Sequence, residues 1–136
     1  MNTLGNLTIG MSAEMQLLVT RQMTIGYFVP GMPYVYATPM MVLHMEMAAG
    51  SAIADALPAG FVSVGMEVNI RHLAATPIGG AVRAIARVTG IGAKSVIFDV
   101  EAWNDARKIG EGTHRRGIVN MTEFEKRFGV REKALA

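Results

Sequence analysis

The sequence predicts an α+β fold in which a curled, antiparallel, five-stranded sheet wraps around one long central helix. Residues 38–57 are apolar nearly all round, and such a helix must be buried on most sides. Four strand-like segments follow it, separated by glycine-containing connections of hairpin length. One more strand precedes the helix, so helices and strands do not alternate as they do in a parallel α/β fold.

The N-terminal part supplies the first strand and the start of the helix. The strand is expected at 13–21, and the glycines and prolines of 24–39 prevent a persistent helix or central strand there. Thr38 and Pro39 predict the helix start, as a hydroxyl N-cap followed by proline at the first helical position. The helix is expected to end near Leu57, which precedes a proline.

The remaining strands are expected at 61–73, 80–91, 95–104 and 113–121, with the segment DARKIGEG turning the chain before the last. Residues 61–73 alternate in polarity, which predicts one core-facing row: Val62, Val64, Met66, Val68, Ile70 and His72. Thr122 and Glu125 predict a capping box for a C-terminal helical tail at 122–136.

Length and composition predict one domain, residues 1–136, with a substantial core. The absence of cysteine excludes disulfides, thiolate zinc sites and cysteine nucleophiles, and we expect neither a metal nor a cofactor.

A net charge of +2 argues against a nucleic-acid partner. The N-terminus does not resemble a signal peptide, and the longest apolar stretch, 39–57, carries charged residues. We therefore expect a soluble, cytoplasmic protein without a membrane partner.

Three polar residues stand where structure alone does not require them. Glu46 shares one helix face with Val42, Ala49, Gly50 and Ile53. Two of these neighbours are small and leave room for a ligand, whereas an unused carboxylate on a packed face costs free energy. His72 ends the apolar row of its strand. Thr38 places a hydroxyl at a helix N-terminus, where free N–H groups favour a developing negative oxygen.

Each of these residues also has a purely structural interpretation. Thr38 can be only an N-cap, His72 a hydrogen-bonded core histidine, and Glu46 the partner of a buried arginine or of His44. The spacing raises a further question, because eight helical positions separate Thr38 from Glu46, or roughly 12 Å along the axis. Either the helix starts later, or two subunits packed about a twofold axis bring the residues together. We favour the second alternative.

Three segments resemble a known family: VYATPMMVLHMEMAAGSAI, VGMEVNIRHLAATPIGG and EGTHRRGIVN. They are similar to the fluoroacetyl-CoA thioesterase-like family of hotdog-fold proteins, over most of the chain up to residue 122. The resemblance implies a hotdog fold that works as a homodimer, or as a higher oligomer. It also implies that Thr38, Glu46 and His72 form the catalytic group of an acyl-CoA thioesterase.

The implied reaction is hydrolysis of a short-chain acyl-CoA to the free acid and CoA. Glu46 would activate water or attack the thioester carbon directly, His72 would hold the carboxylate or carry a proton, and Thr38 would donate a hydrogen bond. The implied substrate-binding residues are Val29, Met32, Gly65, Gly79, Arg115 and Arg116. Arg71 is a further candidate for binding the CoA phosphates.

One departure concerns the acyl pocket. The specialised members carry an aromatic pair where this chain has Val29 and Met32, so the resemblance does not imply specificity for a fluorinated substrate. Two alternatives to hydrolysis stay open: a hotdog acyl-CoA hydratase or dehydratase, and a non-catalytic protein that sequesters acyl-CoA.

Overall fold

The structure, a computed structural model, describes residues 5–129. Its strands are β1 (Ser12–Leu18), β2 (Phe61–His72), β3 (Ala81–Ile91), β4 (Ser95–Asn104) and β5 (Arg107–Asn120). Its helices are α1 (Ile25–Phe28), α2 (Thr38–Ile53) and α3 (Met121–Phe128), with short 3₁₀ turns at Arg21–Met23 and Ala54–Ala56. No helix among the described residues is long and apolar enough to cross a membrane.

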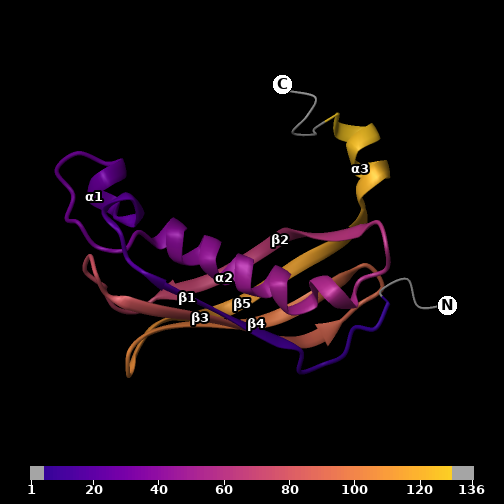
Figure 1. Cartoon of the computed structure of the whole chain (residues 1–136), viewed down its shortest axis with the longest axis horizontal. Coiled ribbons are helices and arrows are strands. Elements are labelled where there is room, and N and C mark those ends of the chain that lie inside the picture. Colours follow the sequence, from indigo (N-terminus) through magenta and orange to yellow (C-terminus); the bar gives the residue numbers. More distant parts are fainter. Residues whose placement is uncertain (1–4, 130–136) are drawn as a thin grey trace.

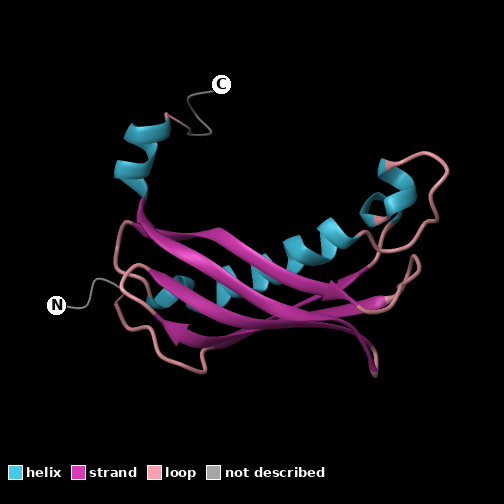
Figure 2. Cartoon of the chain, turned by 180° about the vertical axis from the view of Figure 1, so that it is seen from behind, coloured by secondary structure: helices cyan, strands magenta, loops and turns pink. Residues whose placement is uncertain are grey.

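The five strands form one antiparallel sheet in the order β1-β3-β4-β5-β2, and α2 runs along one of its faces (Figure 1). The view from behind shows the strands twisting across the helix (Figure 2). The predicted α+β fold, a curled sheet around one long helix, is confirmed. The sheet stays open, so β1 and β2 are its edges.

The core lies between α2 and the inner face of the sheet. Five apolar side chains of the helix are at most 1% exposed: Met41, Met45, Ala48, Ala49 and Ile53. The opposite side of the helix is open, because Leu43 and Met47 are 45% and 49% exposed. The prediction that the helix is buried on most sides is therefore wrong for a single chain.

A β-bulge changes the facing of β2. Gly65 pairs with Arg116 and Glu67 with Arg115, so Met66 is an extra residue in the ladder. Before the bulge, Ser63 and Gly65 contact groups on the helix side; after it, Ile70 packs against the core. The predicted single row from Val62 to His72 is thus correct only after the bulge, and the residues Val62, Val64 and Met66 lie on the other face.

Other boundaries differ from the predictions. β1 ends at Leu18, and α2 ends at Ile53, where a 3₁₀ turn continues the chain. Most of the segment DARKIGEG belongs to β5, because the turn before it is only two residues long and has Asp105 at a positive φ of 52°. Ala37 rather than Thr38 is the N-cap residue of α2.

The C-terminal helix begins one residue earlier than predicted, and the predicted capping box is wrong. Asn120 is the N-cap of α3, and its side chain accepts a hydrogen bond from the backbone N–H of Glu123. α3 leaves the sheet at the end of β5 and points away from it (Figure 1). The predicted tail beyond residue 129 lies outside the described residues.

Candidate active site

Thr38 and His72 lie side by side at the N-terminal end of α2. Thr38 is the first residue of the helix and His72 the last residue of β2. The Thr38 hydroxyl and His72 Nδ1 are 2.7 Å apart and share a hydrogen bond. The other ring nitrogen, Nε2, is buried and has no hydrogen-bond partner among the described residues. Buried polar atoms are normally paired, and the Ala74 backbone lies close enough to the His72 ring to raise its pKa against the effect of burial.

A cavity of about 530 Å³ adjoins this pair. Thr38, His72 and Met32 line it, together with apolar residues that include Ile25 and Val35. Its volume falls within the range of small-molecule sites, and its largely apolar walls suit an acyl group. Met32 and Val29 are similarly exposed, at 45% and 44%, but only Met32 lines the cavity.

Glu46 lies further along the helix, over β2 and β5. Its carboxylate oxygen Oε2 is 3.7 Å from Nη1 of Arg116, and the Glu46 side chain is 32% exposed. A Cβ atom built on Gly65 would stand only 2.5 Å from the same oxygen. The carboxylate therefore occupies space that only glycine at position 65 leaves open.

Arg116 lies next to the Glu46 carboxylate and is held in place by Ser63. Its Nε donates to the Ser63 hydroxyl at 2.8 Å, and Nη2 donates to the Ser63 carbonyl at 2.9 Å. The guanidinium packs against the helix at Gly50, where an added Cβ would lie 3.6 Å from Nη2, an ordinary contact. Only 12% of the Arg116 side chain is exposed. Arg116 is thus a buried neighbour of Glu46 rather than a rim residue for phosphates.

The structure brings Thr38 and His72 together but leaves Glu46 apart. The helix does not start late, because Thr38 already belongs to α2. Eight helical positions then place Glu46 roughly 12 Å along the axis, too far for one thioester carbonyl to meet both side chains. Within one chain the predicted catalytic group is therefore split into two halves. Thr38 and His72 form one half, and Glu46 forms the other.

Other predicted binding residues lie elsewhere. Arg115 pairs with Glu67 and with the Ser95 hydroxyl, and it faces away from His114 and Arg116 because side chains alternate along β5. Gly79 lies in the turn before β3, at a φ of +86°, and its N–H donates to the carbonyl of Val19. Arg71 pairs with Glu111. None of these three residues lines the cavity beside His72.

The residue patterns described above did not identify His114, which lies two positions before Arg116 on β5. It is 1% exposed and faces the helix side of the sheet. Burial lowers its pKa, the Arg116 charge adds to that effect, and a bond to the Glu67 carbonyl and the Glu46 charge oppose it. The period-2 spacing of His114, Arg116 and the buried Ile118 could have identified this inward row.

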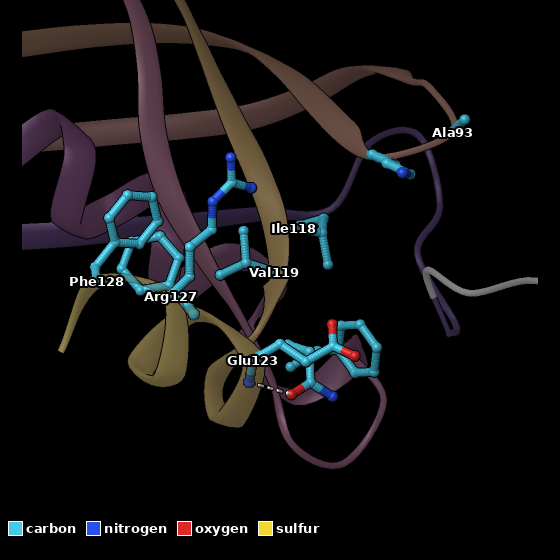
Figure 3. Close-up of a pocket in the computed structure, with 10 residues that line it drawn as sticks. Ala93, Ile118, Val119, Glu123, Arg127 and Phe128 are labelled. Carbon is cyan, nitrogen blue, oxygen red and sulfur yellow. Dashed lines mark hydrogen bonds between the residues drawn. The ribbon is translucent and has the colours of Figure 1, made fainter. Parts of the chain in front are cut away.

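A second cavity lies where α3 leaves the sheet, with a volume of about 470 Å³ (Figure 3). Arg127 and Phe128 of α3, Ile118 and Val119 of β5 and Ala93 in the β3–β4 turn contribute to its lining. No residue predicted as a site residue lines it. The predicted site residues thus all lie outside this cavity.

The burial of three histidines indicates how the stability of the fold depends on pH. Burial lowers the pKa of His44, which shares a hydrogen bond with the Tyr36 hydroxyl, and likewise that of His72 and His114. Below about pH 6.5 the unfolded chain therefore binds more protons than the folded one. Stability should be complete above that pH and decline as the pH falls towards the lower folded-state pKa values.

Urea unfolding between pH 7.5 and 5.5 checks this prediction. The lowered carboxyl pKa values of Glu14 and Glu111 act only nearer to pH 4.5 and below, so they do not interfere in this window. A His44→Gln variant, which cannot titrate, should show a shallower decline. Equal or greater stability of the wild type at pH 5.5 would contradict the assignment of neutral, buried histidines.

Comparison with known proteins places the chain in a family. Residues 19–122 match the family of the fluoroacetyl-CoA-specific thioesterase FlK. The fluoroacetyl-CoA thioesterase of Streptantibioticus cattleyicolor is 35% identical over 104 residues, which cover 76% of this chain and 73% of that protein.

Solved structures agree with this match. An FlK variant in complex with fluoroacetate and CoA has a TM-score of 0.80 at 29% identity, covering 87% of this chain and 99% of that one. A hot-dog-like protein from Thermanaerovibrio acidaminovorans has a TM-score of 0.83 at 22% identity, covering 90% and 91%, and confirms the hotdog fold. The chain therefore belongs to the fluoroacetyl-CoA-specific thioesterase family and is a thioester hydrolase.

Proposed function

We propose that the protein hydrolyses short-chain acyl-CoA thioesters at a composite site, formed by Thr38 and His72 of one subunit and Glu46 of a second. The observation that carries the proposal is that each half is incomplete by itself. One half has a cavity and an unpartnered His72 Nε2, and the other has a partly exposed carboxylate. The similarity to FlK, which binds CoA in a solved complex, supports an acyl-CoA substrate.

Exposed apolar side chains support the homodimer that this site needs. Leu43 and Met47 are exposed on α2, and Val68 is exposed on the neighbouring edge strand β2, after the bulge. An apolar helix face beside an open sheet edge is a surface that a second copy can cover. A twofold axis there would set the two α2 helices antiparallel, so that Thr38 of one chain approaches Glu46 of the other.

The chemistry follows from the groups that would then meet. The substrate's acyl group would enter the cavity beside Met32, with its carbonyl oxygen near the Thr38 hydroxyl. Glu46 would remove a proton from an attacking water, or attack the thioester carbon itself and form an anhydride that water then hydrolyses. In both routes the carbon–sulfur bond breaks, and the CoA thiolate leaves and takes up a proton. Burial lowers the pKa of His72, so its neutral ring can hold or relay a proton near neutral pH.

The test is thiol release from acyl-CoA substrates of graded length, with and without a fluorine on the α-carbon. The aliphatic cavity should accept several small acyl groups, because one methylene of contact discriminates by only about 10–200-fold. A preference of many orders of magnitude for fluoroacetyl-CoA over acetyl-CoA would contradict this open specificity. Binding of acyl-CoA without thiol release would instead support sequestration, and water addition to an enoyl-CoA would support a hydratase.

A further inference from the structure

His114 is held in a single hydrogen-bonding state. Its Nδ1 lies 2.8 Å from the backbone carbonyl of Glu67, and a carbonyl oxygen only accepts, so Nδ1 carries the proton. Its Nε2 lies 3.2 Å from Nη1 of Arg116, and a guanidinium only donates, so Nε2 is unprotonated. The ring also stacks on Phe98, with centroids 6.0 Å apart. His114 is therefore a fixed, neutral acceptor aimed at Arg116.

The same guanidinium nitrogen serves both His114 and Glu46. Nη1 lies 3.2 Å from His114 Nε2, but 3.7 Å from the Glu46 carboxylate oxygen and 3.4 Å from the Glu46 carbonyl. A close arginine–carboxylate contact is usually about 2.7–2.9 Å long. The ion pair is thus longer than it would be if Arg116 were free to approach.

We propose that His114 is a positioning residue, which holds Arg116 back from the Glu46 carboxylate so that the carboxylate stays near a positive charge but free to react. The inference rests on the chemical role of Glu46 proposed above. Without the acceptor at Nε2, Nη1 moves to the carboxylate and occupies an oxygen that must bind a proton or attack carbon. Arg116 remains tied to Ser63 in either case, so the change is local.

Two substitutions test the roles of the two ring nitrogens of His114 separately. In His114→Asn the side-chain amide can reach the position of Nδ1 and keep the bond to Glu67, but it offers no acceptor to Arg116. In His114→Gln the longer side chain can place its oxygen at the position of Nε2. We expect the asparagine variant to lose about ten-fold in kcat, as for one hydrogen bond to a charged group, with KM little changed. The glutamine variant should stay within about threefold of the wild type.

A double-mutant cycle distinguishes positioning from a general structural role. In an Arg116→Gln background, His114→Asn should cause no further loss of kcat, because the group through which it acts is gone. Equal losses in both backgrounds would overturn the proposal, and so would a ten-fold loss in the glutamine variant. The glutamine result decides the matter alone if the asparagine variant does not fold.

A second measurement does not depend on turnover. In a crystal structure of His114→Asn, Nη1 of Arg116 should lie about 2.7–2.9 Å from the Glu46 carboxylate, whereas in His114→Gln it should stay near 3.7 Å. The same distance in both variants would overturn the proposal. If the wild type released no thiol from any acyl-CoA, the proposed function would fail, whereas these two structures would still decide the role of His114.

Discussion

Replacing Glu46 by glutamine is expected to lower kcat by about 10²–10⁴-fold, the usual effect of losing a catalytic base or nucleophile. The amide has nearly the same shape and cannot accept a proton or attack carbon at neutral pH. Because the side chain is one-third exposed and lies 3.7 Å from Arg116, the folded structure should survive the change. Thiol release from the best acyl-CoA substrate and a melting curve together check this expectation.

Glu67→Gln is the matched control. Glu67 lies on β2 close to Gly65, but its carboxylate pairs with Arg115 on the face of the sheet away from Glu46. It should retain wild-type kcat, since an exposed ion pair contributes little to stability and nothing to the reaction. Wild-type activity of Glu46→Gln, or equal losses in the two variants, would remove Glu46 from the chemistry.

A methyl group added at Gly65 is expected to reduce kcat by about 10²-fold, as a displacement of a reacting group by about 1 Å can do. The new Cβ would stand 2.5 Å from Oε2 of Glu46, so the carboxylate must move. The displaced atom is the end of a flexible side chain, and Gly65 does not have a positive φ, so stability should change little. Steady-state kinetics and a melting curve of Gly65→Ala measure both effects.

Gly90→Ala provides the comparison for this substitution. Gly90 also lies beside a β-bulge, in β3, and a Cβ there would meet Ile97 at 3.4 Å, which is close to ordinary contact. The Gly90→Ala variant should therefore keep the kcat of the wild type. If Gly65→Ala were as active as the wild type, the carboxylate would not need its present position.

The fold could be predicted because its determinants are local and repeated. The apolar stretch starting at Thr38-Pro39 and the four alternating segments after it are patterns of period 3.6 and period 2. The bulge at Met66 could not be predicted, because its alternating pattern looks the same with or without one extra residue. The exposed side of α2 was missed for a different reason: apolar residues do not reveal whether the same chain or a second copy covers them.

The candidate site was only partly predictable. A carboxylate and an imidazole in apolar rows identified Glu46 and His72, and the hydrogen bond between Thr38 and His72 joins two of the three predicted residues. The role of Arg116 depends on which face of β5 it occupies and on its hydrogen bonds to Ser63 of β2, which are tertiary facts. The network around His114 depends in turn on the register between β2 and β5.

Complementation between two inactive variants tests the composite site most directly. One parent is Glu46→Gln, and the other carries Thr38→Ala together with His72→Ala. A mixed dimer would contain one site with all three groups intact and one site with none. With random exchange half of the dimers are mixed, so activity should return to roughly a quarter of the wild-type value. No recovery, despite heterodimers detected by native mass spectrometry, would show that each site takes all three residues from one chain and would contradict the account.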